Sequence, residues 1–415
     1  MKTKVLLTSI LVLTLVALSF GVIQAQEVKL TLAGWSSNPA EDAALQAQLD
    51  LFTAETGIAV EFVPSTDHVV TMQTAFASGD YPEVFYVDSS KLPDWAEAGV
   101  MAPGDDMIED QAGFYQPLLD VFTYDGTLYC PPKDFSTLAL QYNKDLFDAA
   151  GLDYPTNDWT WDDLTAAAAA LSNPDEGIIG LVLPPEMARW LPSMYQAGGS
   201  VFDADGNYTF DSEETRQAIE FYLSFAENGS GGTPSAVDAG WGGEAFGTGR
   251  AAMAMEGNWA IQFLLDNYPD LNWGVVELPA GPAGKATMAF TVCYGVAAAN
   301  DYPEESWALV NFLTGEAGAQ AVAEASFGPM PTRSSAAEAY LATWVTRAEG
   351  SGLDPADIQA FVAGGDYAKR WQFPVGWQVF IDAFNAALQR AFNGEATVDD
   401  VMFESNAAAE ELMSE

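Results

Sequence analysis

Apolar and polar residues alternate one by one near the start of the chain. Val28, Leu30 and Leu32 are apolar, and Lys29 and Thr31 between them are polar. Successive side chains of a strand point to opposite faces, so this pattern predicts a strand with one buried face.

A helical pattern follows this strand. Leu45, Leu49 and Phe52 recur at the spacing that places side chains on one face of a helix. Pro39 suits the first turn of a helix, and Gly57 suits the position just after its end. We expect one helix between these two residues.

The next segments repeat the alternation of strand and helix. Ile58–Val63 has the pattern of a strand, Val69–Ser78 that of a helix, and Val84–Val87 that of a short buried strand. Strand, helix, strand, helix and strand in series predict a parallel sheet covered by helices, and hence an α/β fold.

Polar and aromatic residues follow each of these strands. Trp35 and Ser36 come after the first strand, Asp67 after the second, and Asp88 and Ser89 after the third. Ligands of parallel sheets bind beyond the carboxyl ends of the strands. We therefore expect these five residues to meet at one rim and to contact a ligand.

The remaining two thirds of the chain mix helices with strands. No repeat of 20–50 residues is visible, which argues against solenoids and propellers. The patterns predict helices over 160–171 and 211–226 and from 258 onward, strands over 251–255, 273–278 and 288–299, and mostly helix after Pro303.

Composition changes this picture in two ways. The 415 residues include 59 Asp and Glu against 15 Lys and Arg, a formal net charge of −44, so nucleic acid is excluded as a main partner. The apolar content of 49% excludes a disordered chain, and the length exceeds what one hydrophobic core usually supports. We expect two lobes or domains.

The first residues have the features of an export signal. Lys2 and Lys4 precede an apolar run from Val5 to Phe20, and small residues follow. We expect residues 1–25 to be a signal peptide cleaved after Ala25, with a retained membrane anchor as the alternative. Because no cysteine lies near this boundary, a Cys-anchored lipoprotein is not expected. The mature protein is expected outside the cytoplasm, in a periplasm, at the cell surface or secreted.

The sequence argues against most catalytic chemistry. His68 is the single histidine, and neither a nucleophile elbow nor a phosphate-binding loop occurs, so we expect no metal site and no cofactor. His68 is expected to be a rim or ligand contact rather than a base. Cys130 and Cys293 are the two cysteines, and they either pair as a disulfide or remain buried thiols.

The chain is rich in tryptophan, with 12 residues of this type. Several lie beside Gly, Pro or polar residues rather than inside apolar runs. Flat sugar faces stack on indole rings, so these side chains suit a carbohydrate site, although each could equally be part of the core. The five candidates are Trp35, Trp190, Trp241, Trp259 and Trp371.

Five segments in order along the chain resemble one family. Gly126–Pro132 runs into Leu140–Phe147, whose Tyr-Asn-Lys-Asp-Leu-Phe sequence is the most specific of them. With the other four, it resembles the extracellular solute-binding proteins (family 1 type) of carbohydrate ABC transporters. The other segments are Gln196–Gly199 with Asp205-Gly206, Gly249–Met253 leading to Gly257–Trp259, Trp307–Gly315, and Gly328–Arg333.

The resemblance implies an α/β fold of two lobes with a ligand cleft between them, as in periplasmic binding proteins. The N-terminal lobe would comprise 27–137 plus 287–330, and the C-terminal lobe 138–286 plus 331–415. Crossing segments near 135–140, 288–290 and 329–333 would act as hinges. A monomer of this kind would bind a sugar or oligosaccharide without catalysis and deliver it to the membrane permease subunits of the transporter.

The carboxyl ends of the first strands and the resemblance together predict a set of ligand contacts. Two members of the set have a structural alternative, a plain helix cap for Asn258 and a surface ion pair for Arg333. The set is Trp35, Ser36, Asp67, Asp88 and Ser89 from the first lobe, Phe135 and Arg333 from the crossings, and Trp190, Trp241, Glu256, Asn258, Trp259 and Trp371 from the second lobe.

Two other functions fit the same residues. A secreted carbohydrate-active enzyme is supported by the aromatic residues and the surplus of carboxylates. The same fold could also bind a non-sugar solute such as a polyamine, for which an acidic cleft would be suitable and whose binding would weaken in salt.

Overall fold

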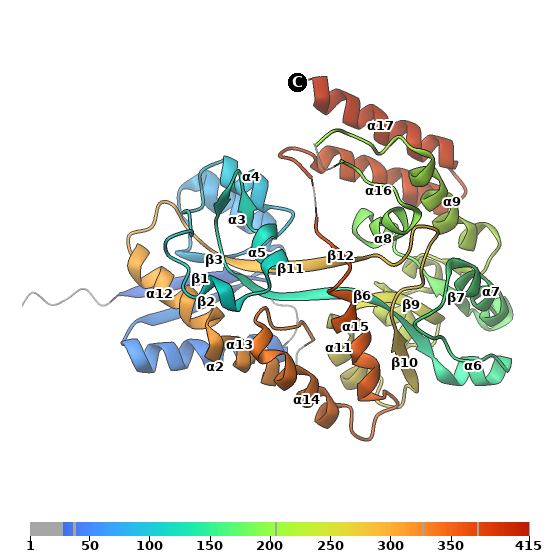
Figure 1. Ribbon diagram of the computed structural model, residues 1–415, viewed down its shortest axis with the longest axis horizontal. Helices are drawn as coiled ribbons and strands as arrows, with labels where there is room; N and C mark the ends of the chain where they lie inside the picture. Colours follow the sequence, from blue (N-terminus) through green and yellow to red (C-terminus); the bar gives the residue numbers. More distant parts are fainter. Residues whose placement is uncertain (1–27, 36–38, 204–205, 326–327, 372, 415) are drawn as a thin grey trace, which may run out of the picture.

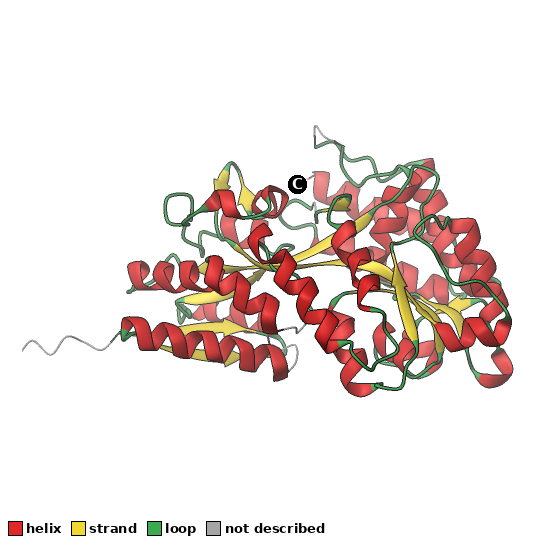
Figure 2. Cartoon of the chain, turned by 60° about the horizontal axis from the view of Figure 1, so that its bottom comes forward, coloured by secondary structure: helices red, strands yellow, loops and turns green. Residues whose placement is uncertain are grey.

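The computed structural model describes residues 28–35, 39–203, 206–325, 328–371 and 373–414. The predicted signal peptide and Ser36 lie outside these residues. The fold is α/β, with two lobes joined by long strands (Figure 1). Figure 2 shows helices packed around the strands of both lobes.

The predicted βαβ series forms the first lobe. Its elements are β1 (Lys29–Gly34), α2 (Pro39–Thr56), β2 (Ala59–Pro64), α3 (His68–Ser78) and β3 (Val84–Asp88). β1 lies between β2 and β3 and is parallel to both, which confirms the parallel sheet expected from the alternation. Leu45, Leu49 and Phe52 of α2 are buried, as their spacing predicts.

Two long strands connect the lobes. β6 (Pro132–Asn143) and β11 (Thr287–Val296) pair in antiparallel fashion where Asp134–Thr137 faces Ala289–Val292. β11 also pairs with β3 of the first lobe. The second half of β6 pairs with strands of the second lobe, so one continuous sheet passes through both lobes (Figure 1).

The second lobe is built around the far end of β6. Its strands β7 and β9 are parallel to each other, and β9 is antiparallel to β6. Amphipathic helices cover this sheet. One of them, α9, corresponds to the helix expected over 211–226. The elements are α6 (Lys144–Ala150), α7 (Trp161–Leu171), β7 (Ile179–Val182), α8 (Met187–Ala197), α9 (Glu213–Glu227), β8 (Gly231–Gly232), α10 (Gly242–Gly247), β9 (Ala251–Gly257), α11 (Trp259–Asn267) and β10 (Trp273–Val276).

The chain returns to the first lobe along β11 and ends in the second. Helices dominate after Pro303, as expected from the sequence. The remaining elements are α4 (Leu92–Glu97), α5 (Gln116–Val121), β4 (Thr123–Tyr124), β5 (Thr127–Leu128), α12 (Pro303–Thr314), α13 (Glu316–Ala325), α14 (Ala337–Arg347), α15 (Gln359–Gly364), β12 (Ala368–Lys369), α16 (Gln378–Phe392) and α17 (Val398–Ser414).

Buried side chains form separate cores in the two lobes. One apolar cluster spans Leu30–Leu128 together with Cys293–Leu313, and it defines the N-terminal lobe. Two further clusters contain residues from Leu138 to Ala409 and fill the C-terminal lobe, but they also include Met288, Ala319, Ala323 and Met330 from the segment predicted for the N-terminal lobe. The lobe limits given above remain a prediction.

Cys130 and Cys293 are joined by a disulfide, a choice that the sequence left open. Their Cα atoms lie 5.7 Å apart, and 163 positions separate them in the chain. Cys293 belongs to β11 and Cys130 lies two residues before the start of β6, so the bond joins β11 to the segment that enters β6, on the N-terminal-lobe side.

Candidate functional site

A cavity of about 710 Å³ lies between the two lobes, and we call it the aromatic cleft. Its walls come from the ends of β1 and β3 in the first lobe, from the crossing strands, and from α11 in the second. It is lined by Trp35, Pro39, Glu41, Tyr86, Asp88, Lys133, Asp134, Ser136, Trp241, Trp259, Gln262, Phe263, Asp266, Asn267, Phe290, Thr291, Val292 and Pro329.

Indole rings from both lobes line this cleft, and each is supported by a second aromatic ring. Trp35 meets Tyr86 edge to face, with ring centroids 5.6 Å apart. Trp241 packs against Phe263 at 4.8 Å. Such edge-to-face contacts fix ring orientation, so the cleft offers preset flat apolar surfaces.

Tyr86 lies over the end of β1 because residue 34 is glycine. A Cβ atom at Gly34 would come within 2.7 Å of the Tyr86 ring. His68 supports the same region, since its Nε2 lies 2.8 Å from the Tyr86 carbonyl oxygen and its ring contacts Trp35 at 5.2 Å. His68 is buried, and desolvation lowers its pKa. It therefore supports the wall of the cleft from behind.

Trp259 is held in place by a buried ion pair. Its Nε1–H donates to Oε2 of Glu256 at 3.2 Å, and Arg189 approaches the same carboxylate at 3.4 Å. The Arg189 guanidinium lies 4.9 Å from the Trp259 ring centroid, a cation–π geometry. Burial raises the pKa of Glu256, and the charge of Arg189 opposes that rise.

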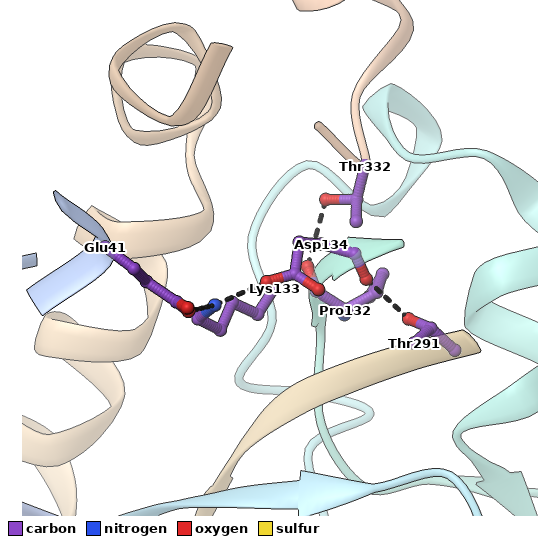
Figure 3. Close-up of polar contacts among 6 residues, drawn as sticks. All are labelled: Glu41, Pro132, Lys133, Asp134, Thr291 and Thr332. Atoms are coloured by element: carbon purple, nitrogen blue, oxygen red, sulfur yellow. Dashed lines mark hydrogen bonds and ion pairs between the residues drawn. The ribbon is translucent and has the colours of Figure 1, made fainter. Parts of the chain in front are cut away.

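A lysine and two carboxylates form the floor of the cleft (Figure 3). Lys133 Nζ donates to Glu41 Oε1 at 2.8 Å and also to Asp134. Desolvation opposes the charge of Lys133, but Asp134 and Glu41 raise its pKa well above the usual value. Burial raises the pKa of Asp134, and Lys133 counteracts part of this shift. The lysine is thus a fixed cation between two acids.

The backbone around this ion cluster is tied to the other crossing segments. Thr291 Oγ1 of β11 donates to the carbonyl oxygen of Asp134 at 2.7 Å. Thr332 Oγ1 donates to the carbonyl oxygen of Pro132 at 3.0 Å (Figure 3). All three crossing segments therefore meet at the floor of the cleft.

Four of the sequence-predicted contacts lie together in the aromatic cleft, namely Trp35, Asp88, Trp241 and Trp259. Others line neighbouring cavities. Ser89 and Trp371 line one of about 740 Å³, and Phe135 lines one of about 660 Å³. Asp67 is exposed beside Trp35 in a shallow pocket.

Four predicted contacts lie away from these cavities. Trp190 has no exposed surface and packs in the core of the second lobe between Phe210 and Phe384, so its selection from the sequence needs correction. Glu256 lies behind Trp259 with 1% of its surface exposed.

Asn258 and Arg333 are used within the fold. Asn258 is fully buried; its Oδ1 accepts from the backbone N–H of Thr137 at 3.2 Å and its Nδ2 donates to the Gly328 carbonyl at 2.8 Å. Arg333 is 3% exposed, pairs with Asp110 at 2.6 Å and donates to the Thr314 carbonyl. Both correct the sequence interpretation, because these side chains connect crossing segments to the lobes.

Lys133, Asp134 and Ser136 in the floor of the cleft were not among the contacts expected from the sequence. Phe135 was among them, although alternate residues of a strand point to opposite faces. Asp134 and Ser136 face the aromatic cleft, and Phe135 faces the cavity behind it. Alternation around Phe135 could have found Asp134 and Ser136, but not Lys133, which is two residues from Phe135 along β6 and still lines the cleft.

Within the described residues, no group of acidic, histidine and cysteine side chains has the arrangement of a metal site. In the same part of the chain, none of the helices combines the length and apolar character needed to cross a membrane. The groups that line the aromatic cleft are aromatic rings, carboxylates, amides and one paired lysine.

Two α/β lobes around a cavity with aromatic walls define a two-lobed solute-binding protein. The chain belongs to the family of bacterial extracellular solute-binding proteins, whose model matches residues 36–320. This match covers more than half of the chain and includes the crossing strands and α11.

Known relatives resemble the chain over most of its length. A putative binding protein of Brucella abortus is 24% identical over 402 residues, 94% of each chain. The arabinooligosaccharide-binding protein of Halalkalibacterium halodurans is 25% identical over 251 residues, 58% of this chain and 55% of that protein. An ABC substrate-binding protein of Listeria monocytogenes, solved in complex with cycloalternan, has a TM-score of 0.83 and 25% identity, covering 94% of this chain and all of the other.

Proposed function

We propose that this protein is the extracytoplasmic binding component of an ABC importer and that it binds a sugar or oligosaccharide in the aromatic cleft. The observation that carries the proposal is the placement of Trp35, Trp241 and Trp259, from both lobes, around one cavity. The flat apolar faces of sugar rings stack on indole, and the carboxylate of Asp88 and the amide of Gln262 accept and donate at hydroxyl groups.

Binding would favour a closed arrangement of the lobes. A ligand that contacts Trp35 in one lobe and Trp259 in the other gains contacts only when the lobes approach each other. Such differential contact shifts the equilibrium toward the closed form, which the permease subunits would then recognise. Strands β6 and β11 and the segment around Met330 would act as the hinge, and the protein would work outside the cytoplasm as a monomer.

The proposal includes no chemical step. The buried acids near the cleft are already paired, since Glu256 contacts Arg189 and Asp134 contacts Lys133. Incubation with oligosaccharides should therefore leave them intact, as chromatography of the supernatant would show. Released products would favour the carbohydrate-active enzyme instead.

A thermal-shift screen tests the proposal. Maltotriose, arabinotriose, mannotriose, mannitol and cyclic glucans form the panel, and spermidine represents the cationic alternative. A saccharide at 100 times its Kd should stabilise the protein by about 2.7 kcal/mol. If spermidine alone stabilises the protein, and high salt abolishes this effect, the polyamine alternative would be favoured.

A further inference from the structure

Acidic side chains outnumber basic ones in the lining of the aromatic cleft. Four carboxylates face one ammonium group, that of Lys133, a residue that is only 8% exposed. The charged side chains that line the cleft are Glu41, Asp88, Asp134, Asp266 and Lys133.

Lys133 is poorly placed to receive an anionic ligand. Its Nζ donates to both Glu41 and Asp134, so an incoming carboxylate or phosphate would compete with two fixed acids for one cation. The three groups together keep a negative charge. Displacing either acid would leave a buried carboxylate without its partner, which is costly in a site of low dielectric constant.

A second cation beside the cleft, Arg189, is also paired, and a third, Arg347, is exposed and donates to Gln262 Oε1 of the lining. The guanidinium of Arg189 contacts Glu256 and lies against the rings of Trp259 and Phe290. Its side chain is 17% exposed. Lys133 and Arg189 are both engaged by acids, so neither of them is free to offset the carboxylates Asp88 and Asp266 on opposite lobes of the cleft.

From this arrangement we infer that the aromatic cleft selects saccharides without negative charge and rejects uronates, phosphorylated sugars and sulfated sugars. The inference rests on the proposed function and adds the charge class of the ligand. Hydroxyl groups can donate to the carboxylates, and a protonated amino group on the sugar can do so as well. An acidic group at the same position would face like charges across a partly desolvated gap.

Calorimetric titration with matched probes tests this selection. The probes are maltotriose, arabinotriose and mannotriose, each compared with the form whose primary alcohols are oxidised to carboxylates. For each neutral probe that binds, we expect the Kd of its oxidised form to be at least about tenfold higher at low ionic strength; this quotient is the selectivity ratio. The ratio should shrink as salt screens the carboxylates.

Two variants distinguish the effect of the carboxylates in the cleft from the effect of the overall net charge of −44. The double substitution Asp88→Asn with Asp266→Asn keeps side-chain size and should reduce the ratio to about threefold or less. Asp270→Asn removes one exposed charge just beyond α11, outside the lining of the cleft, and should leave the ratio unchanged. Thermal melts establish that each variant is folded.

The outcomes distinguish the two claims. Equal or tighter binding of an oxidised probe would overturn the charge selection and leave the proposed function intact. An equal drop in the ratio for Asp270→Asn and for the double variant would also overturn it, because the selection would then come from overall charge. Binding of no saccharide, neutral or acidic, would overturn the proposed function itself.

Discussion

Lys91 of the first lobe and Gln378 of the second are joined by a hydrogen bond, with Nζ donating to Oε1 at 2.8 Å across 287 positions of sequence. Next to it, the backbone N–H of Gly376 donates to Asp94 Oδ1 at 3.0 Å. Both contacts link the start of α4 to the start of α16 and the residues just before it. They connect the lobes directly, at residues that do not line the aromatic cleft.

These direct contacts should affect ligand affinity from outside the cleft. Replacing Asp94 by Ala removes the acceptor of a hydrogen bond between the lobes. We expect the closed form to lose about 1 kcal/mol and ligand affinity to fall about fivefold. Titration calorimetry measures the change, and Asp80→Ala, an exposed acid of the first lobe, is the control. Unchanged affinity in the Asp94 variant would show that the contact does not favour closure.

Trp259 should contribute directly to binding. Replacing it by Ala removes a ring that faces the cleft and is held by Glu256 and Arg189. Saccharide affinity should fall about ten- to hundredfold, because stacking and apolar contact are lost together. The melting temperature of the free protein should change little, since the ring is only partly buried. Retained affinity would place the sugar elsewhere.

Trp190 should behave in the opposite way. Its side chain is fully buried between Phe210 and Phe384, so Trp190→Ala opens a core cavity and should destabilise the C-terminal lobe by about 3–5 kcal/mol. Denaturant unfolding measures this loss. A stable variant with weakened sugar binding would instead restore the assignment of Trp190 as a ligand contact.

The disulfide should stabilise the junction of the crossing strands. Replacing Cys130 and Cys293 together by Ser should lower the free energy of unfolding by about 2–5 kcal/mol, because the bond closes a long loop in the unfolded chain. Thermal melts of the oxidised protein, the reduced protein and the double variant provide the comparison. Identical melting of all three would contradict a stabilising role.

His68 should make stability depend on pH. Burial lowers its pKa below the ordinary 6.5, so the unfolded chain binds more protons than the folded one as the pH falls below that value. This contribution is complete above pH 6.5 and is lost as the pH falls through the folded pKa. Melting between pH 5 and 7.5 should therefore show a steeper decline for the native protein than for His68→Gln. Parallel curves would contradict the prediction.

The sequence predicted the early βαβ series well because local patterns determine it. The alternation of Val28, Leu30 and Leu32 gave β1, and the spacing of Leu45 and Leu49 gave α2. The same reasoning placed Trp35 and Asp88 at the carboxyl ends of neighbouring strands, where both line the aromatic cleft.

The rest of the site depends on partners that are distant in sequence. Arg333 resembles a ligand-binding residue until Asp110 is found beside it, 223 positions earlier in the chain. The side-chain amide of Asn258 likewise forms hydrogen bonds to the backbone of Thr137 and Gly328, which are distant in sequence. Trp190 and Trp259 each follow a polar residue and each lie in a helix, and only packing places one in the core and the other at the cleft.

The most direct test is a crystal structure of the protein with the saccharide that gives the largest thermal shift. The account predicts sugar rings against Trp35, Trp241 and Trp259, with hydroxyl groups bonded to Asp88 and both lobes in contact with the ligand. A saccharide bound at full occupancy outside this cavity, or contacting one lobe alone, would contradict it.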